Sequence, residues 1–216
     1  MYGWIGLCAG ALACVLISEK RGEKKPEWFF KPLASFAFLG LAFSLGALET
    51  PPGQWIFAGL VLSWFGDVFL ISRTEKPFLI GLVAFLLGHV AFLGAFFALE
   101  VNWNPIGIGV GPLVLVSALV TRWLLPHAPR EMRIPIVAYI LVITAMVAAA
   151  FGLWQHENGP LAIGAALCFF LSDLSVAINR FVSASFVHRL WGLPLYYLAQ
   201  ILFGLLAGAL ASSAAI

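Results

Sequence analysis

The sequence predicts an all-α membrane protein, a single domain over residues 1–216 that folds as a bundle of eight transmembrane helices. Hydrophobic residues make up 62% of the chain and charged residues only 10%, and the mean hydropathy is +1.00. Because a soluble domain carries about 25% charged residues, this composition excludes a soluble globular protein. Apolar runs of about 20 residues, the length that crosses a bilayer core, recur along the whole chain.

The predicted spans follow these runs in order and are joined by short connections, so consecutive helices should pack as antiparallel neighbours. A basic cluster at residues 20–25 follows the first run and does not precede it. This order favours a retained helix over a cleaved signal peptide. The expected spans cover residues 2–18, 28–48, 55–72, 78–99, 106–125, 134–154, 161–178 and 190–213.

The basic residues lie in or beside alternate connections, which predicts the orientation of the bundle. The second, fourth and sixth connections carry only the acidic residues Glu49, Glu100 and Glu157. Since Lys and Arg gather in cytoplasmic loops, the odd-numbered connections should be cytoplasmic and both termini should lie on the opposite side. The short termini and connections favour a bacterial inner membrane. The basic residues of the odd-numbered connections and adjoining helix ends are Lys20, Arg21, Lys24, Lys25, Lys31, Arg73, Lys76, Arg122, Arg130, Arg133, Arg180 and Arg189.

Two aspartates stand inside apolar runs and are the first candidates for function. Asp67 lies in the stretch Trp64–Leu70, and Asp173 lies in the stretch Phe169–Leu174. A charged side chain in the hydrocarbon costs at least about 2.5 kcal/mol, so each carboxylate needs a compensating reason. We therefore expect the function of this protein to depend on these two side chains.

Further polar side chains are expected on the same, cytoplasmic side of the membrane. Asp67 precedes Arg73 by six residues, and Asp173 precedes Arg180 by seven. At a rise of 1.5 Å per residue, both aspartates should lie roughly 9–11 Å inward of these arginines. Polar groups from different helices thus share one side of the membrane, and this co-location is the strongest functional signal in the sequence. Besides the aspartates, the candidate site residues are Lys31, His89, Asn179, Arg180, Tyr196, Tyr197 and Gln200.

A purely structural role is the alternative, in which these groups form interhelical hydrogen bonds and Lys31 neutralises an aspartate. Such bonds contribute only about 0.6–2 kcal/mol each. This gain hardly offsets the cost of placing two carboxylates in the membrane, so a functional site is favoured. No three-histidine metal site is expected, because His127, His156 and His188 fall in or beside connections on different sides of the membrane. Nothing in the sequence suggests nucleic-acid binding.

A weak internal repeat relates the two halves of the chain. Asp67 and Asp173 each precede an arginine at similar spacing, and Lys31-Pro32 opens the second span as Arg133-Ile134-Pro135 opens the sixth. Spans one to four and five to eight would then be parallel four-helix repeats, a pattern known in membrane proteins. Chance similarity between short apolar strings explains the same observation equally well.

Six short motifs with polar residues occur one after another along the spans. They are Lys31-Pro32-Leu33, Gly66-Asp67, Gly88-His89, Ser172-Asp173, Asn179-Arg180-Phe181 and Tyr196-Tyr197-Leu198-Ala199-Gln200. This ordered set resembles the YhhN family, which contains the lysoplasmalogenases, and the resemblance covers nearly the whole chain. It implies an eight-helix enzyme that hydrolyses the vinyl ether bond of lysoplasmalogens. The products would be a fatty aldehyde and glycerophosphoethanolamine or glycerophosphocholine.

The family's paired aspartates correspond to Asp67 and Asp173, which the resemblance implies are catalytic. Vinyl ether hydrolysis needs an acid that protonates carbon and a carboxylate that activates water or stabilises an oxocarbenium ion, as in glycosidases. It requires no metal or organic cofactor. Lys31 and Arg180 would hold the lipid phosphate, while Asn179, Tyr196, Tyr197 and Gln200 would orient the glycerol or the water, and His89 would complete the site.

Other functions remain open at the level of sequence. Intramembrane carboxylates and parallel repeats also fit a proton- or cation-coupled transporter. A hydrolase of another lysolipid would keep the fold and change the bond, and a non-catalytic lipid-binding protein is a further alternative. The sequence leaves open the head group of the lipid, the oligomeric state and which aspartate is the acid.

Overall fold

The structure, a computed structural model, describes residues 1–72, 74–99, 101–102 and 106–214. Arg73 and Glu100, which entered the orientation argument, lie outside these residues. The regular elements of the described chain are all helices, and it contains no strand. Its long helices are α1 (Tyr2–Arg21), α2 (Lys24–Ser44), α3 (Pro51–Ile71), α4 (Glu75–Phe97), α5 (Ile106–Leu124), α6 (Arg130–Phe151), α7 (Gly159–Ala177) and α8 (Phe186–Ala214). Two short elements, η1 (Leu125–His127) and η2 (Ile178–Val182), follow α5 and α7.

The helix ends differ from the predicted spans for local reasons. Several helices begin two to four residues before the apolar run, because the helix continues through a polar or proline-containing first turn. In α3, for example, Pro51 and Pro52 occupy the first turn and the Thr50 hydroxyl accepts a hydrogen bond from Gly53 N (3.2 Å). Helix α2 ends at Ser44 and not at residue 48, because Gly46 takes a left-handed conformation with φ of 83°.

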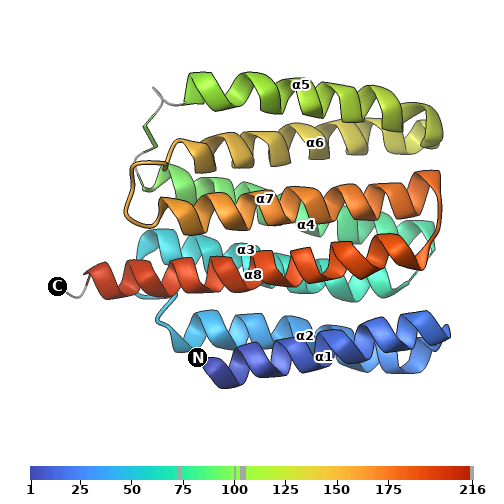
Figure 1. The fold of residues 1–216 in the computed structure, drawn as a ribbon, viewed down its shortest axis with the longest axis horizontal. Coiled ribbons are helices and arrows are strands. Elements are labelled where there is room, and N and C mark those ends of the chain that lie inside the picture. The colour runs from blue at the N-terminus through green and yellow to red at the C-terminus, as the bar shows by residue number, and fades with distance from the viewer. Residues whose placement is uncertain (73, 100, 103–105, 215–216) are drawn as a thin grey trace.

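The helices lie side by side with their axes nearly aligned (Figure 1). Helices α3, α4, α7 and α8 form the centre, where α3 packs on α4 and α8, and α7 packs on α8. Helix α2 contacts α3 and α8 on one side of this centre, and α6 contacts α7 and α4 on the other. Helices α1 and α5 are outermost, at opposite edges of the bundle, and both chain termini lie at the same end (Figure 1).

Six of these helices are long and apolar enough to cross a membrane: α1, α3, α4, α6, α7 with its continuation η2, and α8. Within the described residues helix α5 is not among them, and neither is helix α2. Its first turns carry charged side chains, among them Lys25, Glu27 and Lys31. The prediction of an all-α protein with membrane-spanning helices is therefore confirmed.

The centre of the bundle is built from aromatic rings and close helix contacts. Phe92 of α4 and Phe203 of α8 stack face to face, with ring centroids 3.8 Å apart and an interplanar angle of 5°. The Phe169 ring of α7 packs edge-on against both of them. Glycines bring the helices together at two crossings, because a Cβ on Gly66 would overlap the Phe85 ring and one on Gly192 would overlap Ser175.

The α7–α8 crossing gives a stability test. Gly192→Ala places a methyl group on the Ser175 side chain, so the two helices must separate, and we expect a loss of about 1–3 kcal/mol in the free energy of unfolding. The measurement is denaturant unfolding in detergent micelles.

Gly164→Ala in the same helix pair is the matched control. The nearest atom to its added Cβ is Leu202 Cδ1 at 3.6 Å, an ordinary contact, so this variant should be at least as stable as the wild type. Equal stability of the two variants would contradict the close approach at Gly192.

Candidate active site

Asp67 lies in α3 at the point where α2, α3 and α8 meet, and it is 2% exposed. Its Oδ1 atom is 3.4 Å from the ammonium nitrogen of Lys31 in α2. Its Oδ2 atom accepts hydrogen bonds from the hydroxyl groups of Ser35 (2.6 Å) and Tyr196 (2.5 Å). One cation and two hydroxyl donors thus offset the cost of burying this carboxylate.

Tyr197 forms a second layer behind this cluster. Its hydroxyl donates to the carbonyl oxygen of Lys31 (3.4 Å) and lies 3.3 Å from the Ser35 hydroxyl. Tyr197 is 1% exposed, so it is part of the packed core of the protein. The next residue along α8, Tyr196, faces Asp67 and the cavity described below. The two neighbouring tyrosines therefore have different surroundings: Tyr196 faces the cavity and Tyr197 is packed in the core.

Asp173 lies in α7 and has its partners on α6 and α4. The Tyr139 hydroxyl donates to Asp173 Oδ2 (2.7 Å), and His89 Nε2 lies 3.4 Å from the same oxygen. The Asp173 side chain is 17% exposed, while His89 is fully buried. Asp173 is thus more accessible than Asp67, and no lysine or arginine is within ion-pair distance of it among the described residues.

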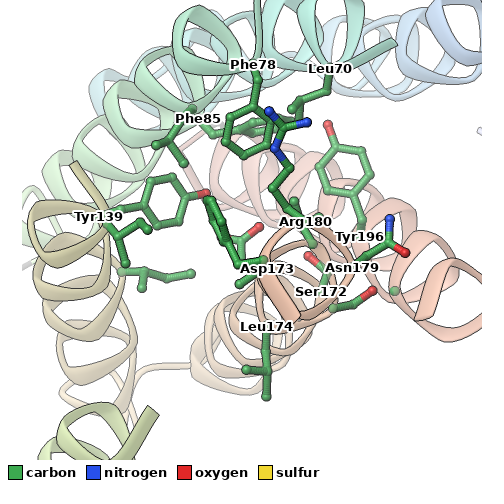
Figure 2. Close-up of a pocket in the computed structure, with 18 of the residues that line it drawn as sticks. Leu70, Phe78, Phe85, Tyr139, Ser172, Asp173, Leu174, Asn179, Arg180 and Tyr196 are labelled. Atoms are coloured by element: carbon green, nitrogen blue, oxygen red, sulfur yellow. The ribbon is translucent and has the colours of Figure 1, made fainter. Parts of the chain in front are cut away.

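Both aspartates line one cavity of about 350 Å³, so the structure brings together the two residues that the sequence singled out. Figure 2 shows Asp173, Tyr139, Arg180 and Tyr196 around this cavity, from four different elements of the fold. Most of the wall is apolar. Its apolar side chains include Leu70, Phe78, Leu82, Phe85, Val120, Leu124, Ile136, Ile140, Ile143, Phe170 and Leu193.

The segment η2 carries Asn179 and Arg180 to this cavity. It is a single π-helical turn, closed by a hydrogen bond from Ser183 N to the Ile178 carbonyl oxygen (2.9 Å). The Arg180 guanidinium lies over the Phe78 ring, 4.4 Å from its centroid. Asn179 Oδ1 accepts a hydrogen bond from Ser185 N (2.9 Å), which fixes the turn toward α8. Such π-helical turns often occur at functional sites.

The candidate residues from the sequence therefore fall into two groups. Lys31, Asn179, Arg180 and Tyr196 line the cavity together with the aspartates. His89, Tyr197 and Gln200 lie behind its wall and are at most 1% exposed. The Gln200 amide has no hydrogen-bond partner within the described part of the chain. Helix rise predicts the height of a residue along its helix, but it does not specify the direction of a side chain around the helix axis.

Three residues of the site were missed by the sequence reasoning. Ser35 follows Lys31 by one helical turn, so its position on the same face of α2 could have been found from spacing. Tyr139 is a tyrosine in an apolar span, a weaker signal. Arg189 also lines the cavity, and its guanidinium pairs with Glu19 and Glu27. The sequence reasoning used Arg189 only for orientation.

In the described ranges, no group of three or more His, Cys, Asp or Glu side chains could hold a metal ion. The cavity presents two carboxyl groups, hydroxyl donors, a lysine and two arginines within largely apolar walls. Two carboxyl groups in different surroundings can act as an acid and as an anion at the same pH. The arrangement therefore suits acid-catalysed chemistry on an amphipathic molecule.

The Lys31–Asp67 ion pair leads to a second stability prediction. Lys31→Met leaves a buried carboxylate without its cation, so we expect a loss of about 3–5 kcal/mol in the free energy of unfolding. Adding Asp67→Asn should recover most of this loss, because no uncompensated charge remains. The measurement is a double-mutant cycle of unfolding free energies in detergent.

Lys76→Met is the control for this cycle, since Lys76 is an exposed lysine at the start of α4, and it should change stability by less than about 0.5 kcal/mol. If Lys31→Met lowers the free energy of unfolding by the same amount with aspartate or with asparagine at position 67, the two side chains are not coupled.

Comparison with known proteins agrees with the resemblance to the YhhN family that the sequence motifs indicate. The sequence profile of the YhhN family matches residues 26–207. The chain is 34% identical to a lysoplasmalogenase of Mycobacterium bovis over 194 residues, which cover 83% of this chain and 72% of that protein. It is 31% identical to lysoplasmalogenase TMEM86A of Homo sapiens (77% of this chain, 71% of that protein). It is also 31% identical to lysoplasmalogenase TMEM86B of Mus musculus (82% and 75%).

No solved structure gives a significant match to this chain. The family profile covers every residue that lines the cavity, from Lys31 to Tyr196. The relatives from bacteria and mammals are similar to this chain over most of their length. On this evidence the chain belongs to the YhhN family.

Proposed function

We propose that this protein is a lysoplasmalogenase, a membrane-embedded hydrolase of the vinyl ether bond of lysoplasmalogens. The products are a fatty aldehyde and a glycerophosphoethanolamine or glycerophosphocholine. The observation that carries the proposal is the cavity with largely apolar walls that both Asp67 and Asp173 line. The lysoplasmalogenases among its relatives support the same reaction, because they are similar over most of this chain.

The proposed chemistry uses the two aspartates as the catalytic pair. A protonated carboxyl transfers its proton to the vinyl carbon β to the ether oxygen, which yields an oxocarbenium ion. Water then adds to the carbon next to the oxygen, and the resulting hemiacetal collapses to the aldehyde and the glycerol hydroxyl. A second, ionised carboxyl stabilises the cation, as in glycosidases.

The polar wall of the cavity fits the head of such a lipid. Arg180 is suited to the phosphate, because it lies in η2 at the end of α7 and arginine binds phosphate through paired donors. Lys31 was also expected to bind the phosphate. Its ammonium group pairs with Asp67, so its proposed role is to keep that carboxylate ionised. Tyr196 faces the cavity and can orient the glycerol or the water, while the alkenyl chain occupies the apolar part.

Two further proposals concern the bundle. The first is that all eight helices cross the membrane as two parallel repeats, α1–α4 and α5–α8. One contact between the halves supports it, since α2 packs on α8 as α6 packs on α4. Gly81 of α4 approaches the Gly66 carbonyl oxygen as Gly192 of α8 approaches that of Ser172. The Phe92–Phe203 stack lies between the two halves.

The second proposal is the orientation of the bundle, with the odd-numbered connections in the cytoplasm of a bacterial cell and both termini on the outer side of the inner membrane. The distribution of lysine and arginine supports it. The cavity's arginines, Arg180 and Arg189, then lie near the cytoplasmic interface, where a lipid head group would enter.

Replacing either aspartate tests the catalytic pair. Asp67→Asn and Asp173→Asn should each lower kcat for aldehyde release by about 10²–10⁴-fold, because positioned proton transfer and charge stabilisation are lost while the shape of the side chain is kept. The assay uses purified protein in detergent with a panel of lysolipids, and reads aldehyde and fatty acid products together.

Glu157→Cys, in the connection between α6 and α7, is a control that should retain wild-type turnover. Full activity in one aspartate variant would remove that residue from the mechanism. Fatty acid release from an ester lysolipid, without aldehyde from lysoplasmalogen, would contradict the proposed substrate.

Cysteine labelling in intact cells tests the number of spans and the orientation. With the three native cysteines replaced, a membrane-impermeant maleimide should label Glu49→Cys and Glu157→Cys from outside and should label Lys76→Cys only after lysis. All three positions are exposed on the surface of the protein. Labelling of Glu49→Cys and Glu157→Cys from opposite sides would contradict eight spans.

A further inference from the structure

The hydrogen bonds of His89 specify where its proton lies. Its Nδ1 atom is 2.7 Å from the carbonyl oxygen of Phe85, one turn earlier in α4. A carbonyl oxygen only accepts hydrogen bonds, so Nδ1 carries the proton of the neutral imidazole. The other ring nitrogen, Nε2, then has a lone pair and is an acceptor.

This acceptor faces Asp173. His89 Nε2 is 3.4 Å from Asp173 Oδ2 and has no hydrogen-bond partner in the described structure. The ring is fully buried and is held by Phe169 (centroids 4.4 Å apart) and Tyr139 (5.2 Å), so it cannot turn to solvent. A lone pair against an ionised carboxylate is repulsive, whereas one additional proton between them makes a hydrogen bond.

The surroundings favour keeping this proton on the carboxyl group. A neutral carboxylic acid beside a neutral imidazole avoids burying two charges in a region of low dielectric. The Tyr139 hydroxyl can still donate to Asp173 Oδ2, because the oxygen of a carboxylic acid hydroxyl both donates and accepts. Three basic residues share the cavity with Asp173. Arg180 has its guanidinium over the Phe78 ring, Lys31 pairs with Asp67, and Arg189 pairs with Glu19 and Glu27.

Asp67 has the opposite surroundings. Its oxygens receive the Lys31 ammonium, the Ser35 hydroxyl and the Tyr196 hydroxyl, and all three are donors. A carboxylate that accepts from three donors, one of them a cation, is stabilised in the ionised form. The two aspartates occupy similar positions in their helices, yet one has a cation and the other has a lone pair as its neighbour.

We propose that Asp173 is the proton donor of the reaction, that His89 is the positioning residue that holds the proton on its carboxyl group, and that Asp67 remains the ionised partner. The catalytic part of this assignment depends on the proposed vinyl ether hydrolysis. The protonation states are a property of the protein without substrate.

The step balances with these assignments. The O–H bond of Asp173 breaks as its proton bonds to the β carbon, and the π electrons of the vinyl group form the new C–H bond. The carboxylate of Asp173 then takes a proton from the water that adds to the oxocarbenium carbon, which restores the acid. A proton passes from the hemiacetal hydroxyl to the ether oxygen as the C–O bond breaks. The Asp67 carboxylate supplies the negative charge beside the cation throughout.

Infrared spectroscopy of the purified protein without lipid tests the assignment. The C=O stretching band of a protonated carboxyl group is distinct from the bands of carboxylates. We expect a component of this band in the wild type at neutral pH that is lost in Asp173→Asn and retained in Asp67→Asn. Loss in Asp67→Asn and retention in Asp173→Asn would overturn the proposal, as would loss in neither variant.

A matched pair of variants tests the part of His89. His89→Phe keeps a ring against Phe169 but removes the acceptor, so the Asp173 component of the band should shift in frequency. Ser35→Ala removes a donor from Asp67 and should leave the band unshifted. An unshifted band in His89→Phe would overturn the positioning role. All variants are compared as monodisperse protein by size-exclusion chromatography.

This experiment separates the inference from the proposed function. If the band follows Asp173 but lysoplasmalogen yields no aldehyde, the protonation states stand and the proposed reaction fails. If aldehyde is released but the band follows Asp67, the reaction stands and the assignment of the acid is overturned.

Discussion

The buried ion pair between Lys31 and Asp67 is the constraint that organises the site. An unpaired carboxylate at this depth would be strongly unfavourable, so α2 must present its lysine to α3 at one particular height. The same carboxylate accepts a hydrogen bond from Tyr196, which ties α8 to this point. Two consecutive helices and the last helix of the chain are therefore aligned by one side chain, and the cavity forms beside them.

A second polar cluster of similar design lies around Asp173, with partners from α6 and α4 in place of α2 and α8. The difference between the clusters lies in the partners. Lys31 keeps the Asp67 carboxylate charged, whereas the acceptor nitrogen of His89 holds a proton on the carboxyl group of Asp173. Acid-catalysed addition of water needs both states together, and one residue type provides both because its surroundings differ.

The sequence was sufficient for the features that depend on composition and periodicity. It predicted the all-helical membrane fold and singled out Asp67 and Asp173, which line one cavity, because apolar runs and the isolated carboxylates within them are visible in the amino-acid pattern. It did not predict that Tyr196 faces the cavity while Tyr197 is packed behind it, since that depends on how α8 is rotated against α3. It also missed the π-helical turn η2, which has no clear signal in the amino-acid pattern.

The measurement that tests the central claim most directly is hydrolysis of lysoplasmalogen in deuterated water, with immediate reduction of the aldehyde and mass analysis. Protonation at carbon predicts a single deuterium on the carbon next to the former aldehyde carbon, together with release of the intact glycerophospho head group. Aldehyde without deuterium at that carbon would contradict the account. Lysoplasmalogen that stays intact after incubation with folded, purified protein would also contradict it.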